Sequence, residues 1–211
     1  MKSVALIDYG SGNLRSAEKA LVRVAEGRAD IVVTHDPAII SAADAVVLPG
    51  VGAFAACMGA LAARDGVIEA MNAAVKDRGV PFLGICVGMQ LMASRGHEFG
   101  VTEGLGWIPG DVRRIAPSDH ALKVPHMGWN TLEGVTDLPM LAGPKSGQPV
   151  YFTHSYAMYP ENERDVAAWV DHGGRFPAAV ARGNMAGVQF HPEKSQSAGL
   201  GLLASFLEWR P

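Results

Sequence analysis

The most informative segment of the chain is Val80-Pro81-Phe82-Leu83-Gly84-Ile85-Cys86-Val87-Gly88-Met89-Gln90-Leu91-Met92. Its first half is almost entirely apolar, which is typical of a strand buried on both faces of a parallel sheet. We expect a helix to follow over residues 88–95. Glycines stand two residues before and two residues after Cys86. This is the pattern of a nucleophile elbow, a strained turn that leaves no room for side chains at the flanking positions.

Cys86 is predicted to be a nucleophile because of its place at this turn. A helix N-terminus favours thiolate over thiol, and the N–H of Val87 would be free to bind an oxyanion. A free thiol with a pKa of about 8.5 is only a few per cent ionised at pH 7, so a base is needed elsewhere in the chain. The alternative is a small buried cysteine with incidental glycines. Cys57 lies in an apolar helical pattern, and we interpret it as core packing.

Short apolar runs alternate with longer helical patterns in the first half of the chain. The predicted strands are 4–7, 31–34, 45–48 and 80–85, and the predicted helices are 13–26, 53–75 and 88–95. This alternation indicates a parallel sheet covered by helices on both faces. The second half has strand patterns at 107–115, 150–157, 166–171, 178–182 and 186–191, followed by a helix at 196–209. We expect antiparallel additions to the same sheet and its edge, within a single domain of residues 1–211.

The composition excludes several classes of protein. Of the 211 residues 48% are hydrophobic and 18% are charged, and the 25 glycines and 13 prolines are too few for a collagenous or low-complexity chain. The formal net charge of −3 supplies no basic field for a phosphate backbone, so no nucleic-acid partner is expected. No membrane partner is expected either, because no apolar run approaches the roughly 18 residues that span a bilayer.

The cysteines, the N-terminus and the histidines favour a cytoplasmic protein without a metal. Two cysteines are too few for a disulfide scaffold or a cysteine-built metal site. The apolar run at 4–7 is shorter than the roughly 7–15 residues of a signal peptide. The histidines are His35, His97, His120, His126, His154, His172 and His191. No two of them have the His-x3-His spacing of a helical metal site, so no metal is expected.

A second apolar pattern ends in a candidate base: Gly187-Val188-Gln189-Phe190-His191-Pro192-Glu193. Residues two apart on an extended chain point the same way, so His191 and Glu193 can project together. A carboxylate beside an imidazole fixes its tautomer and stabilises the imidazolium that forms when a thiol gives up its proton. Alone, such a segment is more often a surface turn. Combined with Cys86 at the sheet edge where open α/β folds place their sites, it predicts a Cys-His-Glu triad.

In the segments 84–90 and 190–193 the chain resembles the class I, or triad-type, glutamine amidotransferases. Blocks at 8–14, 49–54, 125–130 and 191–195 are similar to one branch of that class, the glutaminase subunits of imidazole glycerol phosphate synthase. The blocks recur over nearly the whole chain, and 117–123 and 137–148 are the least similar segments. The resemblance implies a three-layer, flavodoxin-like α/β fold, with a central, mostly parallel sheet and antiparallel additions in the C-terminal half.

The resemblance also implies a chemistry. Cys86 would attack the side-chain amide of L-glutamine to give a glutamyl thioester and ammonia, and water would then release glutamate. His191 would protonate the leaving ammonia and activate the water, and Glu193 would orient His191. Backbone N–H groups near Gly52 and at Val87 would form the oxyanion hole. The positions implied to hold the substrate are Gln90, His154, Ser155 and Tyr156. No cofactor is implied.

A protein partner follows from the same resemblance. In this family the ammonia passes to a (βα)8-barrel cyclase subunit, which makes imidazole glycerol phosphate and aminoimidazole carboxamide ribotide in histidine biosynthesis. The chain would therefore be one half of a heterodimer. The positions that match partner-facing residues of the family are Asn13, Trp129, Tyr151 and Lys194. From the residues alone, Trp129 would lie in the core, Tyr151 would be half-buried and Lys194 solvated.

Other functions stay open at this point. The chain could be the glutaminase of a chorismate- or purine-directed system, although the block at 125–130 disfavours this. It could be a flavodoxin-like binding module or an inactive scaffold, although an intact triad pattern argues against both. A thiol hydrolase of the α/β-hydrolase type would place its acid before its histidine. The glycine-rich turn at 10–15 lacks the third glycine of a dinucleotide fingerprint, because Arg15 stands there.

Overall fold

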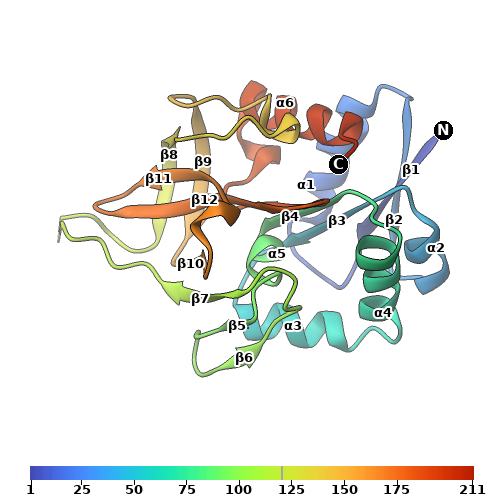
Figure 1. The fold of residues 1–211 in the computed structure, drawn as a ribbon, viewed down its shortest axis with the longest axis horizontal. Coiled ribbons are helices and arrows are strands. Elements are labelled where there is room, and N and C mark those ends of the chain that lie inside the picture. The colour runs from blue at the N-terminus through green and yellow to red at the C-terminus, as the bar shows by residue number, and fades with distance from the viewer. Residues whose placement is uncertain (120) are drawn as a thin grey trace.

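A computed structural model describes residues 1–119 and 121–211; residue 120, in the segment 117–123 that is least similar to the family, lies outside the described residues. Within them, nine strands form one sheet in the order β2-β1-β3-β4-β13-β12-β11-β8-β9 (Figure 1). The first five run parallel. They are β1 (Lys2–Ile7), β2 (Ala29–Thr34), β3 (Ala45–Gly50), β4 (Phe82–Cys86) and β13 (Met185–Val188). β3 and β4 are buried along their whole length, as parallel strands covered on both faces are. The predicted parallel sheet is confirmed.

The other half of this sheet is antiparallel, as predicted. Its strands are β12 (Arg175–Arg182), β11 (Val166–Asp171), β8 (His126–Glu133) and β9 (Pro149–His154). β8 was not expected as a strand. Its burial alternates along the chain, with His126 buried and Met127 and Trp129 exposed. This alternation is typical of an antiparallel strand with one covered face.

A second sheet departs from the prediction. In the described part of the chain four strands pair in the order β10-β7-β5-β6. They are β10 (Tyr156–Pro160), β7 (Gly110–Arg114), β5 (Arg95–Gly96) and β6 (Thr102–Glu103). The expectation that 107–115 and all of 150–157 join the large sheet is wrong. The expected strand 150–157 is divided at Ser155, whose carbonyl accepts a hydrogen bond from the N–H of Ile115 at 2.9 Å, so the chain leaves β9 and pairs with β7 instead.

Helices cover both faces of the large sheet (Figure 1). α1 (Leu14–Ala25) and α6 (Gln196–Glu208) pack against each other. A second group of helices in contact with one another consists of α2 (Pro37–Ala42), α3 (Phe54–Ala62), α4 (Val67–Asn72) and the π-helical η1 (Ala73–Asp77). Short helices also occur at α5 (Val87–Gln90), η2 (Pro139–Leu141), η3 (Glu163–Asp165) and η4 (Pro192–Lys194). None of the helices in the described residues combines the length and the apolar character needed to cross a membrane.

Three helix predictions need correction. The expected helix 53–75 is interrupted between α3 and α4, where Gly66 has φ +74°. α2 was missed, although Asp36 caps it by accepting a hydrogen bond from the N–H of Ala38 at 2.8 Å. The expected helix 88–95 ends at Gln90. Carbonyls that would continue it accept hydrogen bonds from another segment, since Leu105 donates to Leu91 and Trp107 donates to Met92, both at 2.9 Å or less.

Candidate active site

Cys86 lies at the carboxyl end of β4, between the ends of two parallel neighbours. Gly50 of β3 pairs with Cys86 itself, and Val188 of β13 pairs with Ile85. The loop after β3 and the segment after β13 therefore leave the sheet on either side of the thiol. Cys86 has φ +56° and ψ −111°. A non-glycine residue held in such a region stores about 1–3 kcal/mol of strain, and strain of this kind is concentrated at active sites.

The glycines around Cys86 are required by close backbone contact. A Cβ atom on Gly88 would lie 1.8 Å from the carbonyl oxygen of Leu48, and one on Gly84 would lie 2.6 Å from the carbonyl oxygen of Gly88. Both distances are far inside van der Waals contact. Because α5 spans only Val87–Gln90, a long helix dipole does not act on the thiol, and the expected effect of the helix is reduced to local N–H groups such as that of Val87.

His191 and Glu193 form a buried pair. The Nδ1 atom of His191 lies 2.9 Å from Oε1 of Glu193, and both side chains are almost completely inaccessible to solvent. The amide of Asn13 donates a hydrogen bond to the same carboxylate oxygen at 3.3 Å. Nε2 of His191 and Oε2 of Glu193 have no hydrogen-bond partner within the described residues. The Nδ1 side of the imidazole is therefore anchored, while its Nε2 side is available for chemistry.

The pair carries opposite charges. Burial lowers the pKa of His191, but the nearby Cys86 sulfur and the hydrogen bond and charge of Glu193 outweigh burial and raise that pKa to about 9. Burial raises the pKa of Glu193, but its interactions with His191 outweigh burial and hold that pKa below its ordinary value. His191 is thus an imidazolium at neutral pH, next to a carboxylate. The Cys86 thiol affects His191 without reaching hydrogen-bond geometry to Nε2, as is common before a substrate is bound.

A cavity of about 270 Å³ opens beside Cys86. Its lining is Val51, Gly52, Cys86, Val87, Gln90, Glu98, Pro125, Thr153, His154, Ser155, Tyr156 and His191. The structure therefore brings together the predicted nucleophile and base, both predicted oxyanion positions and all four predicted substrate positions. Glu193 does not line the cavity, because it lies behind His191. Among the described residues, no group of three or more His, Cys, Asp or Glu side chains is arranged to hold a metal ion.

The loop after β3 is held by two side chains. The hydroxyl of Tyr9 donates to the carbonyl of Pro49 at 2.7 Å, and the thiol of Cys57 donates to the carbonyl of Val51 at 3.3 Å. Cys57 is buried, as expected for a core residue, but its hydrogen bond to this loop was not foreseen. In a trans peptide the N–H points opposite to the carbonyl, so the Gly52 N–H points away from Cys57. Gly52 has φ +108°, a conformation that favours glycine.

The histidine in the cavity wall, His154, is neutral. Burial lowers the pKa of His154 to about 4, against a hydrogen bond to the carbonyl of Tyr156 that raises it. Burial and the neighbouring His154 and His172 lower the pKa of His126 to about 3. Nδ1 of His126 lies 3.0 Å from Nε2 of His154. One end of the cavity is therefore lined by neutral donors and acceptors, while His191 provides the positive charge at the other.

Two polar residues near the nucleophile were missed in the sequence. Glu98 supplies the one carboxylate of the cavity lining, and its Oε2 accepts the N–H of Phe54 at 2.8 Å. Gln189 is completely buried, and its Nε2 lies 3.6 Å from the sulfur of Cys86. A glutamine inside the otherwise apolar run 185–190 was the available signal for Gln189. No local pattern marks Glu98, because it reaches the site from the hairpin between β5 and β6.

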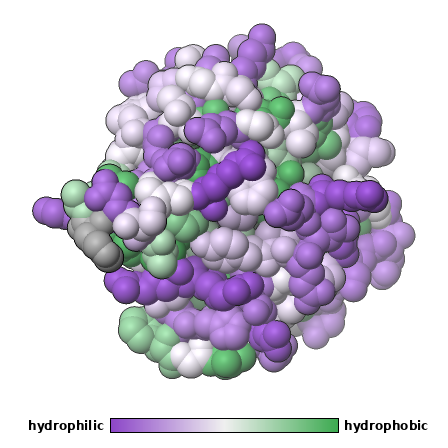
Figure 2. All heavy atoms as spheres, turned by 60° about the vertical axis from the view of Figure 1, so that its left-hand side comes forward, coloured by the Kyte–Doolittle hydropathy of each residue, from purple (hydrophilic) through white to green (hydrophobic). Residues whose placement is uncertain are grey.

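The predicted partner-facing residues divide into two groups. Trp129 is 48% exposed, so its interpretation as a core residue is wrong. Its ring lies 5.9 Å from the half-buried ring of Tyr151, and the Lys194 ammonium lies 5.8 Å from the Tyr151 ring. We call these three residues the Trp129–Tyr151–Lys194 cluster. Asn13 is buried and is occupied with Glu193 instead. On the face drawn in Figure 2, apolar areas are small and separated by polar residues.

An NMR titration of the histidines tests this electrostatic picture. His191 should lose its proton near pH 9, whereas His126 and His154 should stay neutral between about pH 5 and 9 and serve as internal controls. Glu193→Gln should lower the pKa of His191 by about one unit or more, because less charge then opposes burial.

The raised pKa of His191 also predicts how the free energy of unfolding changes with pH. Because the pKa of His191 is raised above 6.5, its stabilising contribution is complete below pH 6.5 and is lost as the pH rises through about 9. The free energy of unfolding of the wild type should therefore fall over this window more than that of Glu193→Gln. A His191 midpoint near 6.5 that is the same in both proteins contradicts the charge assignment.

Comparison with known proteins was made on the whole chain. The family model described as "Glutamine amidotransferase class-I" matches residues 5–208. The imidazole glycerol phosphate synthase subunit HisH of Caulobacter vibrioides is 60% identical over 214 aligned positions, which cover 100% of both chains. The subunit of the same name from Zymomonas mobilis is 54% identical over 210 positions, covering 99% of this chain and 97% of that one.

Solved structures agree in fold. A crystal structure of a glutamine amidotransferase superposes with a TM-score of 0.72 at 21% identity and covers 97% of each chain. The glutaminase domain of Trypanosoma brucei CTPS, with bound acivicin, has a TM-score of 0.65 at 16% identity and covers 100% of this chain and 96% of that one. The predicted fold class is confirmed. Since the family model spans nearly the entire sequence and full-length relatives share more than half of its residues, the chain belongs to the class I glutamine amidotransferase family.

Proposed function

We propose that this glutamine amidotransferase is the glutaminase subunit of an imidazole glycerol phosphate synthase and supplies ammonia to the cyclase subunit of that enzyme. The observation that carries the proposal is the setting of Cys86, a strained residue at the end of β4 beside a charged His191 that is paired with Glu193. The relatives named above, more than half identical along their full length, support the assignment to this branch of the family.

Hydrolysis proceeds through a covalent thioester. The Cys86 sulfur attacks the side-chain carbonyl carbon of L-glutamine while its proton is held on Nε2 of the charged His191. His191 then protonates the departing nitrogen, which leaves as ammonia, and a glutamyl thioester and a neutral imidazole remain. Water adds to the thioester with the neutral His191 as the base, glutamate leaves, and the free Cys86 sulfur and the charged imidazole are restored. Glu193 holds the imidazole through Nδ1 and stabilises its charged form.

The tetrahedral intermediates carry an oxyanion. The N–H groups of Gly52 and Val87 are assigned as its donors, because both residues line the cavity beside Cys86. One such donor is typically worth about 2.7–4 kcal/mol in the transition state. These donors come from the ends of neighbouring strands, so their spacing is set by the pairing of β3 with β4.

The rest of the cavity matches the substrate. Glutamine carries an ammonium and a carboxylate at its α-carbon and a neutral amide at the other end. Gln90, Ser155 and Tyr156 provide donors and acceptors along the wall, and the neutral His154 adds no charge to it. Glu98 provides the complement to the α-ammonium group, because it is the carboxylate of the lining.

A glutamine-mimicking alkylator tests the nucleophile. Diazo-oxo-norleucine should label Cys86 and leave Cys57 unlabelled, as read by peptide mass spectrometry. Cys86→Ala should reduce glutamine hydrolysis by the complex by at least about a thousand-fold. Cys57→Ser is the matched control, since it keeps a donor for the Val51 carbonyl and should retain most of the activity. Labelling of Cys57 alone, or full activity of Cys86→Ala, would sink the mechanism.

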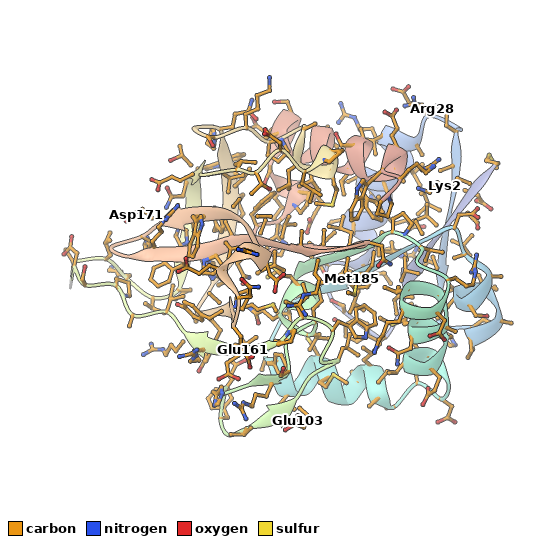
Figure 3. All side chains as sticks on the ribbon, viewed as in Figure 1. Lys2, Arg28, Glu103, Glu161, Asp171 and Met185 are labelled. Atoms are coloured by element: carbon orange, nitrogen blue, oxygen red, sulfur yellow. The ribbon has the colours of Figure 1, made fainter. Side chains whose placement is uncertain are left out.

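Steady-state kinetics test the role of Glu98. Glu98→Gln keeps an acceptor for the Phe54 N–H but removes the charge that faces the substrate ammonium. Its KM should rise by about ten-fold or more while kcat changes little, because a hydrogen bond to a charged group contributes about 1.5–3 kcal/mol. Glu103→Gln, on the exposed strand β6 (Figure 3), is the control and should leave both constants unchanged. An unaltered KM in Glu98→Gln would refute the assignment.

The partner is assigned to the surface that carries the Trp129–Tyr151–Lys194 cluster. We expect a (βα)8-barrel cyclase subunit there, in a heterodimer. An exposed tryptophan and a half-buried tyrosine beside a cation are typical of the residues that contribute most to protein interfaces. Asn13 is assigned to the same side, acting from beneath the surface through its hydrogen bond to Glu193.

Calorimetry with the purified cyclase subunit tests the surface. Trp129→Ala should weaken binding by about 30-fold or more, as expected for a central aromatic residue. Ile39→Ala is the matched control, because Ile39 is 42% exposed but belongs to α2, beside the opposite edge of the sheet. Equal affinities of wild type and Trp129→Ala, or a comparable loss in Ile39→Ala, would place the interface elsewhere.

A further inference from the structure

We propose that the Gln189 carboxamide is a further catalytic residue, which donates a hydrogen bond to the Cys86 sulfur and is kept in the donating orientation by a buried chain of polar groups that reaches β8. The inference rests on the proposed function of Cys86 as the nucleophile. Gln189 follows β13 directly, so it leaves the sheet beside the end of β4. It is 0% exposed, and its Nε2 lies 3.6 Å from Sγ of Cys86.

A donor at this position acts on one protonation state more than on the other. A thiol sulfur is a weak acceptor, whereas a thiolate carries a full charge and accepts a much stronger hydrogen bond. The amide of Gln189 therefore stabilises the thiolate relative to the thiol. This adds to the effect of His191, which acts on the same sulfur as a charge. The amide has no charge of its own and cannot take the proton away from the base.

The orientation of Gln189 follows from its neighbour Gln90. Nε2 of Gln90 lies 2.9 Å from the carbonyl oxygen of Tyr156, which can only accept. The second hydrogen of the same nitrogen is directed at Oε1 of Gln189, at 3.0 Å. Since the oxygen of Gln189 is thus engaged by a donor, its NH₂ group must face the sulfur of Cys86. The opposite orientation would bring two NH₂ groups together.

A pair of histidines, His154 and His126, continues the series of hydrogen bonds beyond the Tyr156 carbonyl. Nδ1 of His154 lies 2.9 Å from the same Tyr156 carbonyl, so this nitrogen carries the hydrogen and Nε2 is an acceptor. Nδ1 of His126 then donates to Nε2 of His154 at 3.0 Å. Nε2 of His126 accepts from the Asn130 amide at 3.1 Å, and the same amide nitrogen donates to the carbonyl of Asp171 at 2.7 Å.

Two backbone carbonyls therefore set every donor and acceptor between β11 and the nucleophile. One belongs to Tyr156 and the other to Asp171. Figure 3 shows Asp171 where β11 ends and the chain turns into β12. This series of hydrogen bonds requires both histidines to be neutral. Burial accounts for this by lowering the pKa of His126 to about 3 and that of His154 to about 4. His126 is also clamped between the rings of Phe152 and His172, at 4.7 Å and 4.1 Å.

The test measures the thiol itself. The rate of Cys86 alkylation by iodoacetamide is recorded against pH in the full-length chain carrying Cys57→Ser, so that Cys86 is the reactive thiol. Other titratable groups act on Cys86: His191 after β13, Tyr9 after β1 and, in the natural chain, Cys57 on α3. His172 lowers the pKa of both His126 and His154. The Gln189 variants leave all of these in place, so a shift between them reports on residue 189.

Gln189→Leu should raise the apparent thiol pKa by about one unit, which is about ten-fold less thiolate below the midpoint. Gln189→Glu keeps an acceptor for Gln90 but places a carboxylate against the sulfur, so it should raise the pKa further. His126→Phe keeps the ring stacking and removes the two ring nitrogens that bond His154 and Asn130. It should raise the thiol pKa by less than Gln189→Leu does. Gln148→Leu, at an exposed glutamine, is the control and should cause no shift.

Circular dichroism first establishes which variants fold. An unchanged alkylation profile in a folded Gln189→Leu or Gln189→Glu protein overturns the inference, and if neither folds, an unchanged profile in His126→Phe does so. Glutamine hydrolysis by Cys86→Ala separates this result from the proposed function. If Cys86→Ala is inactive while the profiles are unchanged, Gln189 has no role on the sulfur but Cys86 is still the nucleophile. If Cys86→Ala is active, the proposed function itself fails.

Discussion

The site depends on how closely the backbone at Gly88 approaches the end of β3. A Cβ on Gly88 would lie 1.8 Å from the Leu48 carbonyl oxygen, and a Cβ on Gly50 would lie 2.7 Å from the Gly88 nitrogen. This contact seats the first turn of α5 directly on the neighbouring strand. The chain can then pass from β4 into α5 only through a tight turn, and Cys86 takes the positive φ that the turn requires. The strain at Cys86 is offset by the buried strands on both sides of it.

Around that turn the partners of two buried histidines decide which of them is charged and which is neutral. Both His191 and His154 are buried and lose solvation, which disfavours the charged form of each. His191 faces a carboxylate and a thiol and is charged. His154 faces a carbonyl and a second histidine and is neutral. Two imidazoles on the same cavity thus have opposite properties. His191 carries a proton that it can give up and take back, whereas His154 is neutral, with both of its ring nitrogens engaged by the Tyr156 carbonyl and His126.

The sequence was sufficient to predict the parts of the molecule that depend on short-range patterns. Apolar strands, flanking glycines and the His-Pro-Glu segment lead to β4, the elbow and the buried His191–Glu193 pair, because each is written within a few residues. Glu98, the division at Ser155 and the early end of α5 could not be predicted. Each of these depends on a contact made by a distant segment, such as the hydrogen bonds from Leu105 and Trp107 that replace those of a continuing helix.

Hydrogen bonds connect the outer surface at Tyr151 to the segment that carries His191. The carbonyl of Tyr151 accepts the N–H of His191 at 2.9 Å. The Ser195 hydroxyl donates to the His191 carbonyl at 2.6 Å and accepts from the Tyr151 N–H at 2.9 Å. The backbone N–H and C=O of Tyr151, whose ring is half-buried, are therefore both hydrogen-bonded to the segment that positions His191. Because those groups are buried or half-buried, displacing β9 would leave them without partners, at a cost of about 1–3 kcal/mol for each. The position of His191 is consequently fixed from the side of the Trp129–Tyr151–Lys194 cluster as much as from the cavity side.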